Sequence, residues 1–432
     1  DNLFAPTSVI QSAQCLAAEA FGAEHTWFLV NGSTAGVIAA IVATCGPGEQ
    51  IILPRNSHVS VISGLILAGA SPVFVPPEYD LRRGIVYGLT PGAIATALAA
   101  YPQAKAILLV YPTYEGICSD ISAIATLAHR HDIPLLVDEA HGPHFHFHPD
   151  LPSSALRAGA DLVVQSTHKI LGSLTQTAML HMQGNRVERQ RISQALQLVQ
   201  STSPNYLLLA SLDLARRQMA LGGEGIMTEV MALAWRARSQ LQAQSGLEIL
   251  TPEQSQPAAG FVSLDPTRIT LFTAALRGDG FQIDQRLMAD FGVAAELVTL
   301  EHLTFLISLG NTEQDIQRLV AAVRQLRSSA HTPLQPEIIP DKMAAFAQPY
   351  STPELLPREA YWSAQEVVPW QRAGHRISAE WVCPYPPGIP AFIPGERIQP
   401  SDLDLLLQIH RLGGKIMGCA DVDLRTLKVV RD

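Results

Sequence analysis

Residues 161–178, DLVVQSTHKILGSLTQTA, decide the fold of this chain. The stretch opens with an apolar run of the kind found in strands that are buried on both faces. Lys169 follows shortly after that run. Desolvation lowers the pKa of a lysine amine and makes it nucleophilic, as Schiff-base formation requires. Ser166 and His168 beside it are donors suited to an anion such as a phosphate. The alternative is a solvated lysine at a strand end.

Apolar runs of the same kind recur on both sides of this stretch. They lie at residues 26–30, 50–53, 72–75, 106–111, 134–137 and 178–182, with 161–165 as the seventh. Helical patterns such as 33–45 and 120–131 lie between most of them. This alternation predicts an α/β fold, a mostly parallel seven-stranded sheet with helices on both faces. In such a sheet the ligand binds beyond the carboxyl ends of the strands.

The second half of the chain predicts smaller units. Two helices broken at Ser203-Pro204 are expected within 185–220, and a separate helix from Glu224 to about Ser245. A smaller α+β unit follows, with strands near 269–273, 294–299 and 303–309 and helices at 282–291 and 313–326. The Pro-rich segment 328–340 predicts a linker. We therefore expect a major domain over 1–222, a small α+β domain over 223–330 and a C-terminal domain over 331–432.

Composition limits the class of protein. The 432 residues are 47% apolar and 16% charged, which excludes a disordered chain and suggests two or three domains. The net charge of −9 argues against a nucleic-acid partner. The longest apolar run, 35–45, is too short to cross a bilayer, and we expect no secretory signal. Five scattered cysteines without a C-x-x-C pair favour a cytoplasmic setting. Because residue 1 is Asp, we interpret the chain as a fragment or a processed form.

Asp138 ends another apolar run, within VDEAHG at 137–142. A carboxylate at the bottom of a pocket can keep a pyridine nitrogen protonated, which makes pyridoxal phosphate an electron sink. A helix-capping aspartate is the alternative. An Asp and a Lys at the ends of two strands of one sheet strengthen the case for each other.

Two further segments follow strands. Residues 30–36, VNGSTAG, lead into a helix whose first N–H groups, with the hydroxyls of Ser33 and Thr34, would form a phosphate site. The pattern is neither a dinucleotide fingerprint nor a P-loop, and a plain helix cap is the alternative. His58, in RNSH at 55–58, could lie flat on a cofactor ring or be a capping residue.

Four histidines at every second or third position suggest zinc: His141, His144, His146 and His148. The phenylalanines and prolines between them favour a packed loop instead. We expect no metal site, and metal analysis would decide the matter.

Residues 164–178 resemble the pyridoxal-phosphate attachment signature of the ornithine/lysine/arginine decarboxylases, a family with the aspartate-aminotransferase-like fold. Other phrases resemble that family in its order from residue 1 to about 398. They are DNLFAPT, FLVNGSTAG, YPTYEGICSD, LLVDEAHG, LHMQ, QSTSPNYLLLASLD and PYPPGIPAFIPGE.

The resemblance implies that pyridoxal 5'-phosphate is attached to Lys169 and that Asp138 pairs with its ring nitrogen. His58 would stack on the ring, His141 would lie beside it, and Thr113 would border its phenolic side. The phosphate would be held by Gly32, Ser33, Thr34, Ser166 and His168.

The implied reaction is α-decarboxylation of arginine, lysine or ornithine, with CO₂ and agmatine, cadaverine or putrescine as products. Asp138 would stabilise the developing charge, and Lys169 or His168 would return a proton to Cα. The candidates for reading the basic side chain are Glu115, Glu380 and Glu396. The alternatives are another reaction on the same fold, such as transamination or a lyase reaction, and a catalytically silent cofactor-binding regulatory protein.

Three departures from the family matter. Val59 stands where family members commonly have a lysine, which puts a phosphate or partner-subunit contact in doubt. The N-terminal wing that builds decamers in the large acid-inducible members is absent, so we expect a homodimer with the active site near the subunit interface. The family's preceding N-terminal segment, which normally helps complete the dimer, is absent too.

Overall fold

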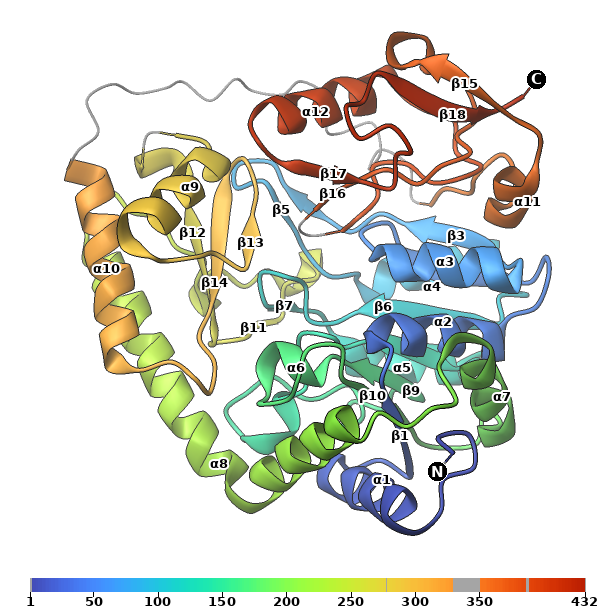
Figure 1. Ribbon diagram of the computed structural model, residues 1–432, viewed down its shortest axis with the longest axis horizontal. Helices are drawn as coiled ribbons and strands as arrows, with labels where there is room; N and C mark the ends of the chain where they lie inside the picture. The colour runs from blue at the N-terminus through green and yellow to red at the C-terminus, as the bar shows by residue number, and fades with distance from the viewer. Residues whose placement is uncertain (1, 277, 329–349, 386–387, 432) are drawn as a thin grey trace.

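The computed structural model describes residues 2–276, 278–328, 350–385 and 388–431. Its centre is a seven-stranded sheet in the order β1-β10-β9-β8-β6-β2-β3 (Figure 1). The strands are β1 (His25–Leu29), β2 (Gln50–Pro54), β3 (Ser71–Val75), β6 (Ala106–Val110), β8 (Leu135–Asp138), β9 (Leu162–Gln165) and β10 (Ala178–Met182). Five neighbours from β9 to β3 run parallel, whereas β10 is antiparallel to both β9 and β1. The predicted mostly parallel seven-stranded sheet is confirmed.

Helices cover both faces of this sheet. One face packs against α2 (Gly32–Thr44), α3 (Val59–Ala68) and α7 (Arg189–Val199). The other packs against α1 (Ser8–Phe21), α4 (Pro91–Ala100), α5 (Ile121–Arg130) and α8 (Tyr206–Gln242). On β6, Ile107 and Leu109 enter one core while Ala106 and Leu108 enter the other. Two buried faces therefore explain why the strands are continuous apolar runs.

The helix α8 corrects one expectation. We expected separate helices ending at residue 220 and beginning at 224, but α8 is a single helix of 37 residues. Its glycine-rich segment lowers helix propensity, yet Met219 and Met227 on either side of it are buried in the same core. A Cβ on Gly223 would lie 3.0 Å from Phe147, so glycine there permits close packing. The division into three domains stays a prediction.

The small α+β unit lies beside the carboxyl edge of the main sheet (Figure 1). Its antiparallel sheet has the order β12-β14-β13. The elements are β12 (Arg268–Phe272), β13 (Leu297–Val298), β14 (His302–Leu306), α9 (Gly280–Phe291) and α10 (Glu313–Ser328), as predicted within a few residues. The remaining strands and α-helix described within the first 328 residues are short: β4 (Tyr79–Asp80), β5 (Ile85–Val86), β7 (Ile117–Cys118), β11 (Ser263–Leu264) and α6 (Thr167–Ile170).

The C-terminal residues form a third unit with its own core around Trp370. Its elements are α11 (Pro357–Trp362), β15 (Gln365–Pro369), β16 (Cys383–Tyr385), α12 (Pro400–Arg411), β17 (Lys415–Met417) and β18 (Thr426–Val430). Figure 1 shows this unit, in red, above α3 and β3. Apart from Ser328, the expected linker 328–340 lies outside the described residues. None of the helices in the described ranges combines the length and apolarity needed to cross a bilayer.

Candidate active site

The predicted cofactor residues all lie at, or shortly after, the carboxyl ends of main-sheet strands. Because β1 and β9 are both antiparallel to β10, β1 points the same way as the parallel strands. Its carboxyl end therefore meets those of β2, β6, β8 and β9 at one edge of the sheet. Gly32–Thr34 follow β1, His58 follows β2, Thr113 follows β6, Asp138 and His141 lie at the end of β8, and 166–169 follow β9.

Lys169 lies on α6 and is half-buried. Its Nζ is 3.1 Å from Nε2 of His141 and 5.8 Å from the centre of the Tyr114 ring. Burial lowers the pKa of the Lys169 amine, against the opposing charge of Asp138, and the guanidinium of Arg268 lowers it further. A lysine in this setting tends toward its neutral, nucleophilic form.

Asp138 is the last residue of β8 and is buried. Its Oδ1 accepts the N–H of Ala140 at 3.2 Å, and its Oδ2 has no hydrogen-bond partner among the described residues. Burial raises the pKa of this carboxyl group, while Lys169 acts in the opposite direction. Asp138 thus has an acceptor oxygen available beside the lysine.

A group of hydroxyls and free N–H donors lies where β1 and β9 end. The Ser166 hydroxyl donates to Oγ of Ser33 at 2.7 Å. The side chain of Asn31 does not cap α2, so N–H groups of its first turn lack a capping acceptor. Gly32 has φ +73°, and its own N–H donates to the carbonyl of Gln176 at 2.8 Å. Thr34 is exposed.

His168 has a fixed tautomer in its neutral form. Its Nδ1 lies 2.7 Å from the carbonyl oxygen of Thr177, which can only accept, so Nδ1 carries the proton. Burial lowers the pKa of His168, against that hydrogen bond. The lone pair of Nε2 is therefore the part of His168 that can take up a proton.

His58 caps α3, with Nδ1 accepting the N–H of Ser60 at 3.2 Å. Burial lowers its pKa to about 4, and Lys169 adds to the effect, so the ring is neutral at pH 7. The next residue, Val59, donates its N–H to the carbonyl of Gly388 at 3.0 Å. His58 is therefore held between the main sheet and the C-terminal unit.

Thr113 is buried in a tight turn between β6 and β7. Its hydroxyl accepts the N–H of Ile117 at 3.2 Å, and its own N–H donates to the carbonyl of Ile117. The expected contact of Thr113 with a cofactor stays a prediction.

Several residues of the site were not predicted from the sequence. Arg268, fully buried on β12, donates from Nη2 to Nδ1 of His141 at 2.7 Å. Glu296, just before β13, is exposed and acts electrostatically on Lys169, His168 and Arg268. Tyr114 lies 4.5 Å from His141 between ring centres. Lys169 was predicted because a basic residue stands next to an apolar run of the kind that forms a buried strand. Arg268 stands next to such a run too, so the same pattern could have identified it.

The three acidic candidates for substrate recognition have separate partners. Oε1 of Glu115 lies 3.4 Å from Nε2 of His302. Burial alone would raise the pKa of Glu115, but the contact with His302 outweighs burial, so the pKa of Glu115 is lowered. Both oxygens of Glu380 accept backbone N–H groups of the C-terminal unit. Glu396 pairs with Arg55 at 3.0 Å. Glu380 and Glu396 are thus bonded within the fold.

The four histidines of the loop after β8 diverge. His141 contacts Lys169, His144 pairs with Asp265 at 3.2 Å, and His148 contacts Thr228 at 3.1 Å. His146 lies beside Phe147, with ring centres 5.6 Å apart. Within the described ranges, no three metal-ligating side chains gather at one point.

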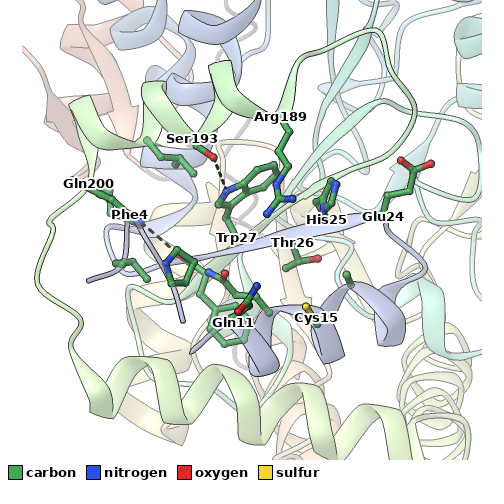
Figure 2. Close-up of a pocket in the computed structure, with 16 residues that line it drawn as sticks. Phe4, Gln11, Cys15, Glu24, His25, Thr26, Trp27, Arg189, Ser193 and Gln200 are labelled. Carbon is green, nitrogen blue, oxygen red and sulfur yellow. Dashed lines mark hydrogen bonds between the residues drawn. The ribbon is translucent and has the colours of Figure 1, made fainter. Parts of the chain in front are cut away.

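A cavity of about 350 Å³ lies away from this site, between α1, β1 and α7 (Figure 2). Thr26 on its wall contacts Nδ1 of the buried His181 at 2.8 Å. His181 contacts Gln165 at 3.1 Å, and Gln165 donates to Glu139 at 2.6 Å. A buried chain of hydrogen bonds therefore runs from β1 across β10 and β9 to Glu139, the residue that follows Asp138 at the end of β8.

Comparisons with known proteins agree with this geometry. The chain matches the family model "Orn/Lys/Arg decarboxylase, major domain" over residues 1–314 and "Orn/Lys/Arg decarboxylase, C-terminal domain" over 340–419. It is 38% identical to the arginine decarboxylase of Bacillus subtilis and 39% identical to that of Halalkalibacterium halodurans, covering 100% of this chain and 87% of each relative. The crystal structure of the Francisella novicida lysine decarboxylase has the same fold, with a TM-score of 0.83, 21% identity, and coverage of 100% of this chain and 73% of that one. The chain is therefore a decarboxylase of the Orn/Lys/Arg decarboxylase family.

Proposed function

We propose that this protein is a pyridoxal-phosphate-dependent α-decarboxylase of arginine, which yields CO₂ and agmatine. The observation that carries the proposal is that a half-buried lysine amine and a buried carboxylate lie at the ends of the neighbouring strands β9 and β8 and act on each other electrostatically. Neighbouring titratable groups whose pKa values are shifted by burial and by each other's charge are typical of a catalytic site.

The residues present fit the cofactor. The uncapped start of α2, with the hydroxyls of Ser33 and Ser166, suits a phosphate. Oγ1 of Thr167, buried and without a hydrogen-bond partner among the described residues, is a further polar atom in the same turn. We assign Lys169 to the aldehyde carbon, Asp138 to the ring nitrogen and the neutral His58 to the ring face. Gly32, Thr34, His141, His168 and Thr113 complete the proposed cofactor set.

When bound, the cofactor supplies an electron sink for the pair of electrons that CO₂ leaves behind at Cα. The protein's part is placement and proton control. Asp138 would hold a negative charge toward the ring nitrogen of the cofactor and so favour its protonated form. His168 has the free lone pair of Nε2, and Lys169 has its amine, so either can carry the proton that Cα must receive.

Arginine is favoured among the basic amino acids because both arginine decarboxylases named above match this chain over its whole length. We assign recognition of its guanidinium to Glu296, because this carboxylate is exposed and has no hydrogen-bond or ion-pair partner among the described residues. A carboxylate can bind a guanidinium through two parallel hydrogen bonds. Glu115 is already paired with His302.

We also propose a homodimer with the active site near the subunit interface. Leu207, Leu214 and Leu221 are exposed at a spacing of seven residues along α8. Exposed Leu174 lies beside them, since its N–H donates to Ser211 of α8 at 3.3 Å. The loop of Leu174 also carries Thr177, the partner of His168, so this exposed apolar surface adjoins the site.

A cytoplasmic setting is supported by the five free cysteines.

The decisive experiment supplies the cofactor-loaded protein with arginine, lysine and ornithine separately and measures CO₂ and the amine product. Release of CO₂ and agmatine, with arginine preferred at least tenfold in kcat/KM, is the expected result. A preference for lysine or ornithine would overturn the substrate assignment. If none of the three amino acids released CO₂, the assignment of the protein as a decarboxylase of these substrates would be overturned.

A further inference from the structure

His141 lies between the guanidinium of Arg268 and the amine of Lys169. Its Nδ1 is 2.7 Å from Nη2 of Arg268, and its Nε2 is 3.1 Å from Nζ of Lys169. His141 and Arg268 are both buried. The two partners come from different units, because Arg268 is on β12 of the small unit and Lys169 follows β9 of the main sheet. The sequence alone indicated no role for Arg268.

The chemistry of these three groups determines where the protons lie. A guanidinium in a protein can only donate, so Nδ1 of His141 must accept. A neutral imidazole that accepts at Nδ1 carries its proton on Nε2. That N–H then faces Lys169, and a lysine can accept it only with the lone pair of an uncharged amine, because an ammonium group has no acceptor.

We propose that Arg268 is a positioning residue: it sets the tautomer of His141, and His141 in turn holds the Lys169 amine uncharged and ready to bind the cofactor's aldehyde. This inference rests on the cofactor assignment in the proposed function. In the attachment step a C–N bond forms between the amine and the aldehyde carbon. The aldehyde oxygen leaves as water with the two amine hydrogens, so no oxidant or reductant is needed.

The charges around Lys169 act in opposite directions on the protonation of its amine, so a hydrogen bond that favours the uncharged form matters. Asp138 and Glu296 favour the ammonium form, whereas burial and Arg268 oppose it. Neutral groups on the other sides are Tyr114, His58 and His168, from the turn after β6, the start of α3 and the start of α6. Burial lowers the pKa of His141 well below its usual range, and Lys169 and Arg268 add to that effect, so the imidazole remains neutral.

Arg268 is also suited to the task by its own surroundings. Its Nε and Nη1 are buried without a hydrogen-bond partner among the described residues, so the hydrogen bond to His141 is the contact that orients it. Asp265, Glu296 and Glu115 act on it electrostatically and balance its buried charge.

The test measures how readily Lys169 of the cofactor-free protein reacts with trace acetic anhydride as a function of pH, read by mass spectrometry of the peptide that contains it. Arg268→Met removes charge and donor. Arg268→Gln removes the charge but keeps an N–H donor. We expect Arg268→Met to raise the pH midpoint of the reaction by at least one unit and Arg268→Gln to raise it by less than half as much. Circular dichroism checks that each variant folds.

A double-mutant cycle separates the hydrogen-bond route from simple charge repulsion. If Arg268 acts through His141, the shift caused by Arg268→Met should fall to less than half in a His141→Phe background. Two results would overturn the proposal. One is an equal shift of the pH midpoint in Arg268→Met and Arg268→Gln. The other is a shift caused by Arg268→Met that is the same in the His141→Phe protein as in the wild type.

A second measurement needs no variant. Histidine-selective ¹⁵N spectra of the cofactor-free wild type should show His141 as the Nε2–H tautomer. An Nδ1–H tautomer would refute the inference even if every variant failed to fold. None of these readouts depends on release of CO₂, so failure of the proposed function and failure of this inference can be told apart.

Discussion

The backbone of Gly388 lies directly against the imidazole of His58. A Cβ on Gly388 would lie 3.1 Å from Cδ2 and 3.2 Å from Nε2 of that ring, and Gly388 has φ +83°. The carbonyl of Gly388 also accepts the N–H of Val59. The C-terminal unit therefore sets the position of the residue that we assign to the ring face of the cofactor.

Gly388→Ala should displace His58 and weaken cofactor binding. We expect the apparent Kd for pyridoxal phosphate to rise roughly tenfold, which corresponds to about 1.4 kcal/mol, as measured by titration of the absorbance of the bound cofactor. Gly246→Ala is the matched control, because Gly246 has φ +78° but a Cβ there would have no atom within 4 Å. Equal losses in both variants would mean that backbone strain alone is responsible.

Asp138→Asn should reduce turnover far more than binding. The amide keeps the shape and can still accept the N–H of Ala140, but it lacks the charge that we place opposite the ring nitrogen. Loss of a preorganised charge of this kind costs about 10²–10³ in kcat. Steady-state kinetics with arginine, together with the cofactor content of the variant, check this. A kcat within threefold of wild type would remove Asp138 from the mechanism.

The sequence alone indicated His58 and Asp138, the two residues on which these predictions act. The main sheet could be predicted because strands buried on both faces form continuous aliphatic runs, and its topology then brings Lys169 and Asp138 to one edge. The small unit's contribution could not be predicted, since Arg268 lies 127 residues from His141 and only tertiary packing joins them. The ion pair of Glu396 could not be predicted for the same reason, because its partner Arg55 is 341 residues away in the sequence.

Glu296→Gln should weaken substrate binding. Replacing a carboxylate that binds a guanidinium removes a charge-assisted hydrogen bond, which is worth roughly 1.5–3 kcal/mol. We therefore expect KM for arginine to rise at least tenfold while kcat changes less than threefold. Glu229→Gln, on the exposed side of α8, is the control and should leave both constants unchanged. An unaltered KM in Glu296→Gln would show that another residue binds the guanidinium.

Glu139→Gln should change how stability depends on pH. Burial raises the pKa of Glu139 from 4.5 to about 8, although hydrogen bonds from Gln165 and Ala155 oppose the rise. Between these two values the native protein holds a proton that the unfolded chain has released, so stability falls as pH rises, by up to about 1.4 kcal/mol per pH unit. Glutamine cannot ionise and removes that slope.

The free energy of unfolding, measured with urea at pH 5, 6, 7 and 8, tests this expectation. The wild type should lose more stability than Glu139→Gln across this range, and the two curves should diverge as pH increases. Glu229→Gln should run parallel to the wild type, because Glu229 is exposed. Parallel curves for Glu139→Gln would mean that Glu139 is already ionised at pH 5 in the folded protein.

Glu396→Ala should lower stability without changing substrate preference. Oε2 of Glu396 accepts both Nη2 of Arg55 and the N–H of Ile393, at 3.0 Å each, so it attaches the C-terminal unit to the main sheet. Leaving the partly buried Arg55 without its carboxylate costs about 1–3 kcal/mol. Glu354→Ala is the control, because its pair with Arg397 is about half exposed and such pairs contribute about 0–1 kcal/mol. We expect a lower Tm in Glu396→Ala alone and the same ratio of kcat/KM for arginine, lysine and ornithine as in the wild type. A changed ratio with an unchanged Tm would instead make Glu396 the group that recognises the substrate.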